Sequence, residues 1–282
     1  MQSCLKYIRN ELSDLYSKNE TEGLIRYIFE YIKKYSVSDL IIHDRDKLSD
    51  KERNMVKKIV SELKSHKPIQ YILNETEFYG LPFKVNNNVL IPRPETEELV
   101  DWIVKENIDF KGSVLDVGTG SGCIAVSLKK KLKDSDVYGI DISEKALIVA
   151  QSNALLNEVN VSFIKKDILN ISNYDSLPKF DIIVSNPPYV TEKEKDKMQD
   201  NVLKYEPFSA LFVPDDDPLK FYRALADTGQ KKLNENGKIF WEINENYGKD
   251  CMRLLEKFHF YNIRLRKDIR GKDRMISAEY KE

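Results

Sequence analysis

The sequence predicts an α/β protein in which a doubly wound parallel sheet carries helices on both faces and follows an N-terminal helical segment. Three observations predict it. From residue 113 onward, short apolar runs alternate with helical segments and short loops. A glycine-rich turn follows the first of these apolar runs. Residues 1 to about 70 show only helical spacing of their apolar residues. Alternation of strands and helices is typical of a parallel sheet covered on both sides.

The N-terminal segment, residues 1–75, is expected to form a small helical domain. Apolar residues recur at helical spacing in residues 5–15, 24–32 and 55–63. Ser49 and Glu52 have the spacing of a capping box, in which each side chain satisfies a free backbone amide of the other residue.

Residues 76–90 are expected to contain a connecting β-hairpin, because aromatic residues alternate around Gly80 and Pro82. Residues 91–282 then form the main domain. Pro92 and Pro94 impose an extended entry, and a helix begins near Glu95.

The main domain divides into strands and helices in order along the chain. The expected parallel strands are 113–117, 136–140, 161–167, 180–185 and 238–243. The expected helices are 123–132, 144–157 with Ser143 as its cap, and 218–234, ended by Asn236 and Gly237. Segments 259–268 and 273–280, on either side of Gly271, are predicted to form a closing antiparallel hairpin. The charged run 191–200 is interpreted as a solvated helix or a mobile loop.

Composition excludes several classes of protein. Hydrophobic residues make up 41% and charged residues 32% of the 282 residues, which argues against disorder and against a membrane protein. The net charge of −1 gives no support to bulk nucleic-acid binding. Three separated cysteines, three scattered histidines and no CxxC motif predict neither disulfides nor a metal site. With no signal-peptide pattern at the N-terminus, we expect a cytoplasmic protein.

The glycine-rich turn, together with Asp141, predicts an adenosine-type cofactor. It reads Asp116, Val117, Gly118, Thr119, Gly120, Ser121, Gly122. Its glycines allow close approach of the backbone to a ligand, and the following helix offers free amides. Asp141 ends the second strand, where a carboxylate can accept bonds from ribose hydroxyls. A nicotinamide oxidoreductase is disfavoured, because the dinucleotide pattern requires Gly or Ala where Cys123 stands.

The second motif is Asn186, Pro187, Pro188 and Tyr189, at the end of the fourth strand. Ligands of such sheets bind beyond the carboxyl ends of the strands, which brings this motif near the first. Proline has no backbone N–H, so the motif is rich in acceptors. The Asn186 side-chain oxygen and the Pro187 carbonyl match the two N–H bonds of a planar –NH₂ group, and Tyr189 can stack on it.

These motifs, with several others, resemble the release factor glutamine methyltransferases. The resemblance covers nearly the whole chain, through residues 67–73, 77–85, 91–100, 116–125, 185–190, 205–207 and 268–274. It implies a seven-stranded class I methyltransferase fold, Rossmann-like, after a small helical domain. Because residues 1–75 are separate from the sheet, we expect them to recognise the protein substrate. The resemblance also implies transfer of a methyl group from S-adenosyl-L-methionine to the glutamine amide of the Gly-Gly-Gln motif in peptide chain release factors.

The resemblance further implies roles for individual residues. Gly118 to Gly122 would surround the methionine part of the cofactor and Asp141 its ribose. Asp167 and Ile168 would flank the adenine, while Arg93, Glu95 and Thr96 would shape the pocket. Asn186 would lie between cofactor and substrate. The sequence departs from the family at residues 213–218, which read VPDDDP, and at 242–246, where EINEN replaces the usual Glu-Ile-Gly.

Two other functions remain open on the residues alone. An N6-adenine methyltransferase acting on DNA or RNA must also hold a planar –NH₂ group. A non-catalytic binding module could keep a nucleotide-binding fold without any transfer chemistry. Against the first stand the balanced charge and the absence of a recognisable nucleic-acid motif. Against the second stands the combination of Asp116–Gly122, Asp141 and Asn186–Tyr189.

Overall fold

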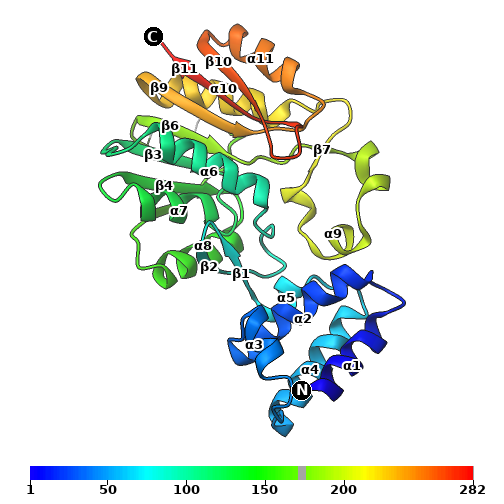
Figure 1. The fold of residues 1–282 in the computed structure, drawn as a ribbon. Helices are drawn as coiled ribbons and strands as arrows, with labels where there is room; N and C mark the ends of the chain where they lie inside the picture. Colours follow the sequence, from blue (N-terminus) through cyan, green and yellow to red (C-terminus); the bar gives the residue numbers. More distant parts are fainter. Residues whose placement is uncertain (171–175, 282) are drawn as a thin grey trace. The chain divides into compact units, whose positions relative to one another are not determined.

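The computed structural model describes residues 1–170 and 176–281, and the chain forms two compact units. The first unit contains residues 1–74 together with residues 199–205. The second contains residues 75–198 and the chain from residue 206 onward. Figure 1 shows both units, coloured along the sequence.

The first unit is a bundle of short helices. They are α1 (Gln2–Leu12), α2 (Lys18–Lys33), α3 (Val37–Ile42), α4 (Asp50–Leu63), α5 (Ile69–Leu73) and α9 (Asp200–Tyr205). Its core contains the apolar stripes expected from the sequence, and Ile8, Ile28 and Val56 are almost fully buried there. The segment that contributes α9 is tied to this unit, because the Tyr205 hydroxyl donates to the Ser65 carbonyl oxygen at 2.9 Å.

The capping box predicted at the start of α4 is confirmed. The Glu52 amide donates to Ser49 Oγ at 3.3 Å, and the Ser49 amide donates to Glu52 Oε2 at 2.7 Å. Equivalent boxes begin α2 at Ser17 and α3 at Ser36. Reciprocal capping satisfies amides that a helix cannot satisfy internally, which allows these short helices to begin at defined residues.

The second unit is built on one seven-stranded sheet with the order β10-β11-β9-β6-β3-β4-β5. Its strands are β3 (Ser113–Val117), β4 (Asp136–Asp141), β5 (Ser162–Lys165), β6 (Phe180–Ser185), β9 (Leu233–Glu242), β10 (Phe260–Lys267) and β11 (Asp273–Tyr280). The first five are parallel, and β11 pairs antiparallel with both β9 and β10. The predicted closing hairpin is therefore confirmed.

Both faces of the sheet are buried under helices, as the sequence predicts. The helices are α6 (Pro94–Glu106), α7 (Cys123–Lys131), α8 (Glu144–Leu156), α10 (Lys220–Lys232) and α11 (Gly248–Lys257). Along β6, Ile182 and Val184 pack into the cluster with α6, α7 and α8, whereas Ile183 packs into the cluster with α10 and α11. Successive side chains of a strand point to opposite faces, so a continuous apolar run packs against both layers of helices. Figure 1 shows these helices beside the sheet.

The hairpin before the sheet consists of β1 (Glu75–Phe78) and β2 (Leu81–Lys84). Its turn residues Tyr79 and Gly80 have φ of 52° and 71°, which suits the twist of a two-residue turn. The Tyr79 amide donates to Glu97 Oε1 of α6 at 3.0 Å. By its contacts the hairpin belongs to the second unit.

The expected boundary between helix 218–234 and its strand is wrong. Helix α10 ends at Lys232, and β9 already begins at Leu233, which is fully buried and pairs with Phe180. Pairing with β6 then shifts register, from Leu233 to Lys238. Asn236, with φ of 62°, and Gly237 lie in this irregular stretch of the strand and do not end the helix.

The charged run 191–200 belongs to a connection, residues 190–213, that lies between β6 and α10 and outside the seven-stranded sheet. This connection contains β7 (Val190–Thr191), the 3-10 helices η2 (Glu192–Lys197) and η3 (Phe208–Ala210), and β8 (Phe212–Val213). Strands β7 and β8 pair in parallel, so the two ends of this connection lie side by side.

Asp116 holds the glycine-rich turn between β3 and α7. Its Oδ2 accepts from Thr119 Oγ1 at 2.6 Å and from the Ala125 amide at 3.2 Å. Its Oδ1 is buried without a hydrogen-bond partner among the described residues. Burial without full hydrogen bonding raises the pKa of Asp116 to about 7.

This shifted carboxyl group makes the stability of the ligand-free protein depend on pH. Because the folded state retains the Asp116 proton up to about pH 7 and the unfolded chain loses it near its ordinary value of 3.8, stability falls as pH rises between these values. The expected slope approaches ~1.4 kcal/mol per pH unit. Asp116→Asn should lose this contribution, so its free energy of unfolding relative to the parent should rise with pH.

Urea unfolding of the ligand-free proteins at several pH values between about 4 and 8 measures this difference. Asp136→Asn is a matched control, because Asp136 is exposed at the start of β4. A constant difference in free energy of unfolding between Asp116→Asn and the parent across this range would contradict the assignment.

Candidate active site

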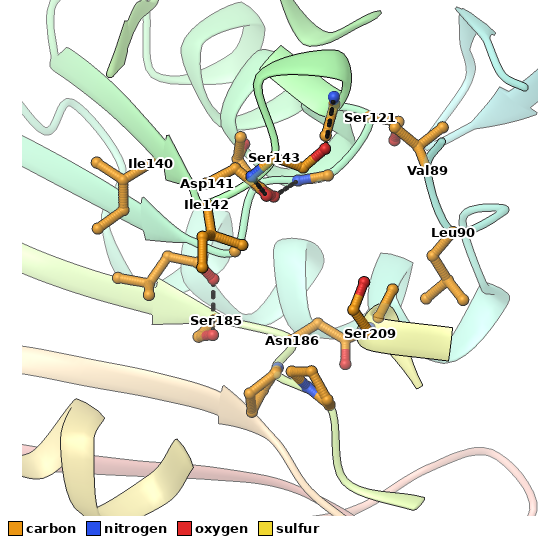
Figure 2. A pocket seen from close by; sticks show the side chains of 18 of the residues that line it. Val89, Leu90, Ser121, Ile140, Asp141, Ile142, Ser143, Ser185, Asn186 and Ser209 are labelled. Carbon is orange, nitrogen blue, oxygen red and sulfur yellow. Dashed lines mark hydrogen bonds between the residues drawn. The ribbon is translucent and has the colours of Figure 1, made fainter. Parts of the chain in front are cut away.

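A pocket of about 410 Å³ lies at the carboxyl ends of β3, β4 and β6 (Figure 2). Its volume is in the range of small-molecule sites. Most of the residues singled out in the sequence lie on its wall. They are Arg93, Thr96, Gly118, Thr119, Gly120, Ser121, Asp141, Asp167, Ile168, Asn186, Pro187 and Pro188.

Four of the singled-out residues lie off this wall, and one of them is Glu95 in the first turn of α6. Asp116 lies in the core beneath the turn, as described above. Gly122 has φ of 79°, and a Cβ there would be 3.0 Å from Ala150 Cβ, so glycine lets the turn pack closely against α8. Tyr189 lines a smaller neighbouring hollow that also includes Asn186.

Asp141 joins two turns at the upper side of the pocket. Its Oδ2 accepts from the Gly120 amide at 2.9 Å, and its Oδ1 accepts from the Ser143 amide at 2.8 Å (Figure 2). Burial raises the pKa of this carboxyl group, and the two amides oppose that shift. Each carboxylate oxygen keeps a further lone pair, so Asp141 can accept bonds from ligand hydroxyls while it holds both turns.

Asn186 faces Asp141 across the pocket (Figure 2). Its Nδ2 donates to Thr96 Oγ1 at 3.1 Å. In the described part of the chain its Oδ1 accepts no hydrogen bond. Pro187 and Pro188 follow it without backbone N–H groups. The end of β6 therefore offers acceptors to the pocket.

Behind Asn186 lies a buried carboxylate that the sequence did not reveal as part of the site. Glu242 ends β9 and is 1% exposed. Its Oε2 accepts from Thr96 Oγ1 at 2.6 Å, and its Oε1 accepts from the Tyr189 hydroxyl at 2.9 Å. Burial raises the pKa of Glu242, and burial together with this carboxylate raises the pKa of Tyr189 well above its usual value.

Arg93 is held by a second buried carboxylate. Its Nη2 donates to Glu206 Oε1 at 2.6 Å, and the Ile91 amide lies 3.4 Å from Glu206 Oε2. Glu206 is 7% exposed, so its charge requires this partner. The ion pair fixes the extended segment before α6, which forms one wall of the pocket.

An apolar part of the wall was not predicted. It includes Val89 and Leu90 before α6, Ile142 after β4, Phe221 and Leu225 of α10, and Pro207 and Ala210 near η3. Ile142 is 60% exposed, which is high for a large apolar side chain. Such residues have no sequence signal of their own, because they resemble ordinary core and loop residues until the fold places them.

Neither a metal cluster nor a membrane span is found within the described ranges. No three His, Cys, Asp or Glu side chains gather there in a way that could hold a metal ion. In the same ranges, every helix falls short of the length and apolar character that crossing a membrane requires.

Family models match two parts of the chain. A model described as PrmC N-terminal domain matches residues 3–73. A model described as methyltransferase small domain matches residues 95–209, which include the glycine-rich turn, Asp141 and the Asn186 motif.

Solved structures share the fold at low sequence identity. A methyltransferase from Pyrococcus furiosus superposes with a TM-score of 0.54 at 18% identity, over 73% of this chain and 91% of its own. A 16S rRNA N2 G1207 methyltransferase from T. thermophilus, solved with AdoMet and guanosine, also gives a TM-score of 0.54 at 18% identity, over 74% of this chain and 50% of its own. With the observed sheet order, they confirm the expected class I methyltransferase fold.

Sequence relatives extend over nearly the whole chain. The release factor glutamine methyltransferase of Flavobacterium psychrophilum is 47% identical over 274 residues, which cover 96% of this chain and 95% of the relative. The enzyme of the same name from Bacteroides thetaiotaomicron is 45% identical over 278 residues, covering 99% of each chain. With the predicted motifs gathered around one pocket, this similarity shows that the chain belongs to the family of release factor glutamine methyltransferases.

Proposed function

We propose that this protein methylates the side-chain amide nitrogen, N5, of the glutamine in the Gly-Gly-Gln motif of peptide chain release factors. As a member of its family the chain is a methyltransferase, and its cofactor is S-adenosyl-L-methionine. The observation that carries the proposal is Asn186, a neutral acceptor that lines the cofactor pocket and is anchored through its own nitrogen to Thr96.

The pocket residues fit this cofactor. A glycine-rich turn whose Gly118 and Gly120 have positive φ allows close approach of the backbone to the ligand. Asp141 offers acceptor capacity for ribose hydroxyls, and Asp167 and Ile168 lie on the wall where the adenine is expected. When bound, S-adenosylmethionine supplies a methyl group on a positively charged sulfur.

The protein side of the reaction is positioning. An amide nitrogen is a weak nucleophile because its lone pair is delocalised into the carbonyl group. In the proposal, Asn186 Oδ1 and the Pro187 carbonyl accept the two N–H bonds and direct the nitrogen toward the methyl group. Good alignment of reacting groups can contribute up to ~7–11 kcal/mol. No described side chain is assigned as a base, and the product proton leaves to solvent.

The first unit is proposed to recognise the release factor. Two observations support this division of roles: a family-specific N-terminal model matches residues 3–73, and every residue that lines the cofactor pocket belongs to the second unit. We also propose a cytoplasmic location and no requirement for metal or nucleic acid. Translation termination takes place in the cytoplasm, and the net charge of −1 gives no general attraction to nucleic acid.

The direct test supplies labelled S-adenosylmethionine with three separate acceptors: an intact release factor, DNA and RNA. Mass mapping of the product should find one methyl group on the glutamine of the Gly-Gly-Gln motif. Methylated adenine in the nucleic-acid reactions, with an unmodified release factor, would instead favour an N6-adenine methyltransferase.

Asp141→Ala should weaken binding of S-adenosylmethionine by about 1–3 kcal/mol, as expected for lost hydrogen bonds to a charged group. Isothermal calorimetry measures this affinity directly. Asp136→Ala, at the other end of the same strand, is the matched control and should bind like the parent. Equal affinity of Asp141→Ala and the parent would remove Asp141 from the cofactor site.

Asn186→Ala should abolish most turnover, because the substrate nitrogen loses its neutral acceptor. Asn186→Asp should lower kcat more than it weakens cofactor binding. Its carboxylate can still accept N–H bonds, but it would also stabilise the positive sulfur before transfer, and that charge dissipates as the methyl group is transferred. Single-turnover kinetics and calorimetry separate the two effects. Release-factor methylation by Asn186→Ala at the parent rate would rule out this arrangement of acceptors.

Removal of residues 1–74 should leave cofactor affinity unchanged and impair methylation of an intact release factor. Because residues 199–205 pack with the first unit, circular dichroism must first establish that the truncated protein is folded. A folded truncation with full activity on the release factor would contradict the assigned role.

A further inference from the structure

A buried chain of hydrogen bonds connects the end of β9 to Asn186. It runs from Glu242 Oε2 to Thr96 Oγ1 over 2.6 Å and from Thr96 Oγ1 to Asn186 Nδ2 over 3.1 Å. Glu242 and Thr96 are 1% and 2% exposed, so water does not compete for these bonds. Glu242, which does not line the pocket, thus acts through Thr96 on Asn186, which does.

In this series of hydrogen bonds, the donor and the acceptor of each bond are fixed. An ionised carboxylate has no proton to donate, so the single hydroxyl hydrogen of Thr96 is committed to Glu242. Thr96 Oγ1 can then only accept, and Asn186 must present Nδ2 to it. The amide oxygen of Asn186 is consequently left for the pocket.

We propose that Glu242 is a positioning residue that fixes the orientation of the Asn186 amide, so that its oxygen and not its –NH₂ group meets the substrate. The proposal rests on the proposed function, because an acceptor is needed only if the substrate presents N–H bonds. It adds a residue on β9 to a site whose sequence motifs lie at the ends of β3, β4 and β6.

Burial and the neighbouring Glu95 carboxylate raise the pKa of Glu242, whereas its polar contacts oppose this rise and support the ionised form that this arrangement of donors and acceptors requires. Both of its oxygens accept from hydroxyl groups, those of Thr96 and Tyr189. The positive charge of Arg274 acts on it as well, and that guanidinium lies 6.0 Å from the centre of the Tyr189 ring. These interactions offset part of the cost of burying a charge.

A neutral residue at position 242 no longer fixes which group donates and which accepts in these hydrogen bonds. The –NH₂ group of Gln can donate to Thr96, which frees the Thr96 hydroxyl to donate to Asn186 Oδ1. The Asn186 amide then turns over, and its –NH₂ group faces the –NH₂ group of the substrate, where two donors cannot bond. The change alters neither the volume of the side chain nor the wall of the cofactor pocket.

Glu242→Gln should therefore lower kcat roughly tenfold to hundredfold, the effect of one misdirected hydrogen bond, while cofactor affinity stays within about twofold. Glu235→Gln is the matched control, because it makes the same change at an exposed position of β9 and should keep parent activity. Parent kcat in Glu242→Gln would overturn the proposal.

A double-mutant cycle distinguishes positioning from a general structural role. Because Glu242 acts through Asn186, adding Glu242→Gln to Asn186→Ala should cause no further loss of kcat. Independent, multiplicative losses would overturn the proposal. If Glu242→Gln fails to fold, Thr96→Val interrupts the same chain and must give the same result in the cycle.

A second readout needs no turnover. In the ligand-free parent, nuclear Overhauser contacts should join the Asn186 side-chain N–H protons to the Thr96 methyl group, and Glu242→Gln should weaken them. Unchanged contacts would overturn the proposal even if the protein acts on another acceptor. If the parent protein did not methylate release factors, that result would contradict the proposed function but not the role of Glu242.

Discussion

The parallel alignment of β3 between β4 and β6 is the constraint on which the rest of the second unit depends. Asp116 pairs with Gly139 on one side and with Val184 on the other, so the three strands end at the same edge. This register brings together the glycine-rich turn, Asp141 and Asn186, which are far apart in the sequence. Because β6 buries side chains on both faces, a shift in register would expose apolar residues in either layer.

Much of this arrangement could be predicted from the sequence, because it follows from local patterns. The apolar runs gave the bounds of β3 and β6 as the structure has them, and a strand followed by a glycine-rich turn located the pocket. The end of α10 could not be found in this way. Asn236 and Gly237 are typical helix terminators, but the pairing of Leu233 with Phe180 extends the strand past them, and that pairing is a tertiary effect.

The unpredicted part of the site consists of residues whose role arises from long-range contacts. Glu242 lies 146 residues from Thr96 along the chain, yet the two side chains share a buried hydrogen bond. Glu206 is likewise 113 residues from Arg93. A carboxylate at the end of a strand has no sequence feature that distinguishes burial from exposure. Sequence motifs therefore identified residues that line the pocket. The buried carboxylates that hold those residues in place could be recognised only once the fold was known.

Asn244 shows how this chain accommodates its departure from the family pattern at EINEN. Its φ lies outside the left-handed region, so the backbone there does not require glycine. Its Nδ2 donates to the Tyr189 carbonyl oxygen at 3.1 Å and to Glu194 Oε2 at 3.0 Å. The larger side chain thus ties the end of the Asn186 motif to η2, in the charged run that the sequence suggested was merely solvated. A glycine at position 244 has no side chain that could donate to the Tyr189 carbonyl oxygen. In this chain Asn244 makes that hydrogen bond, which fixes the backbone beside the pocket.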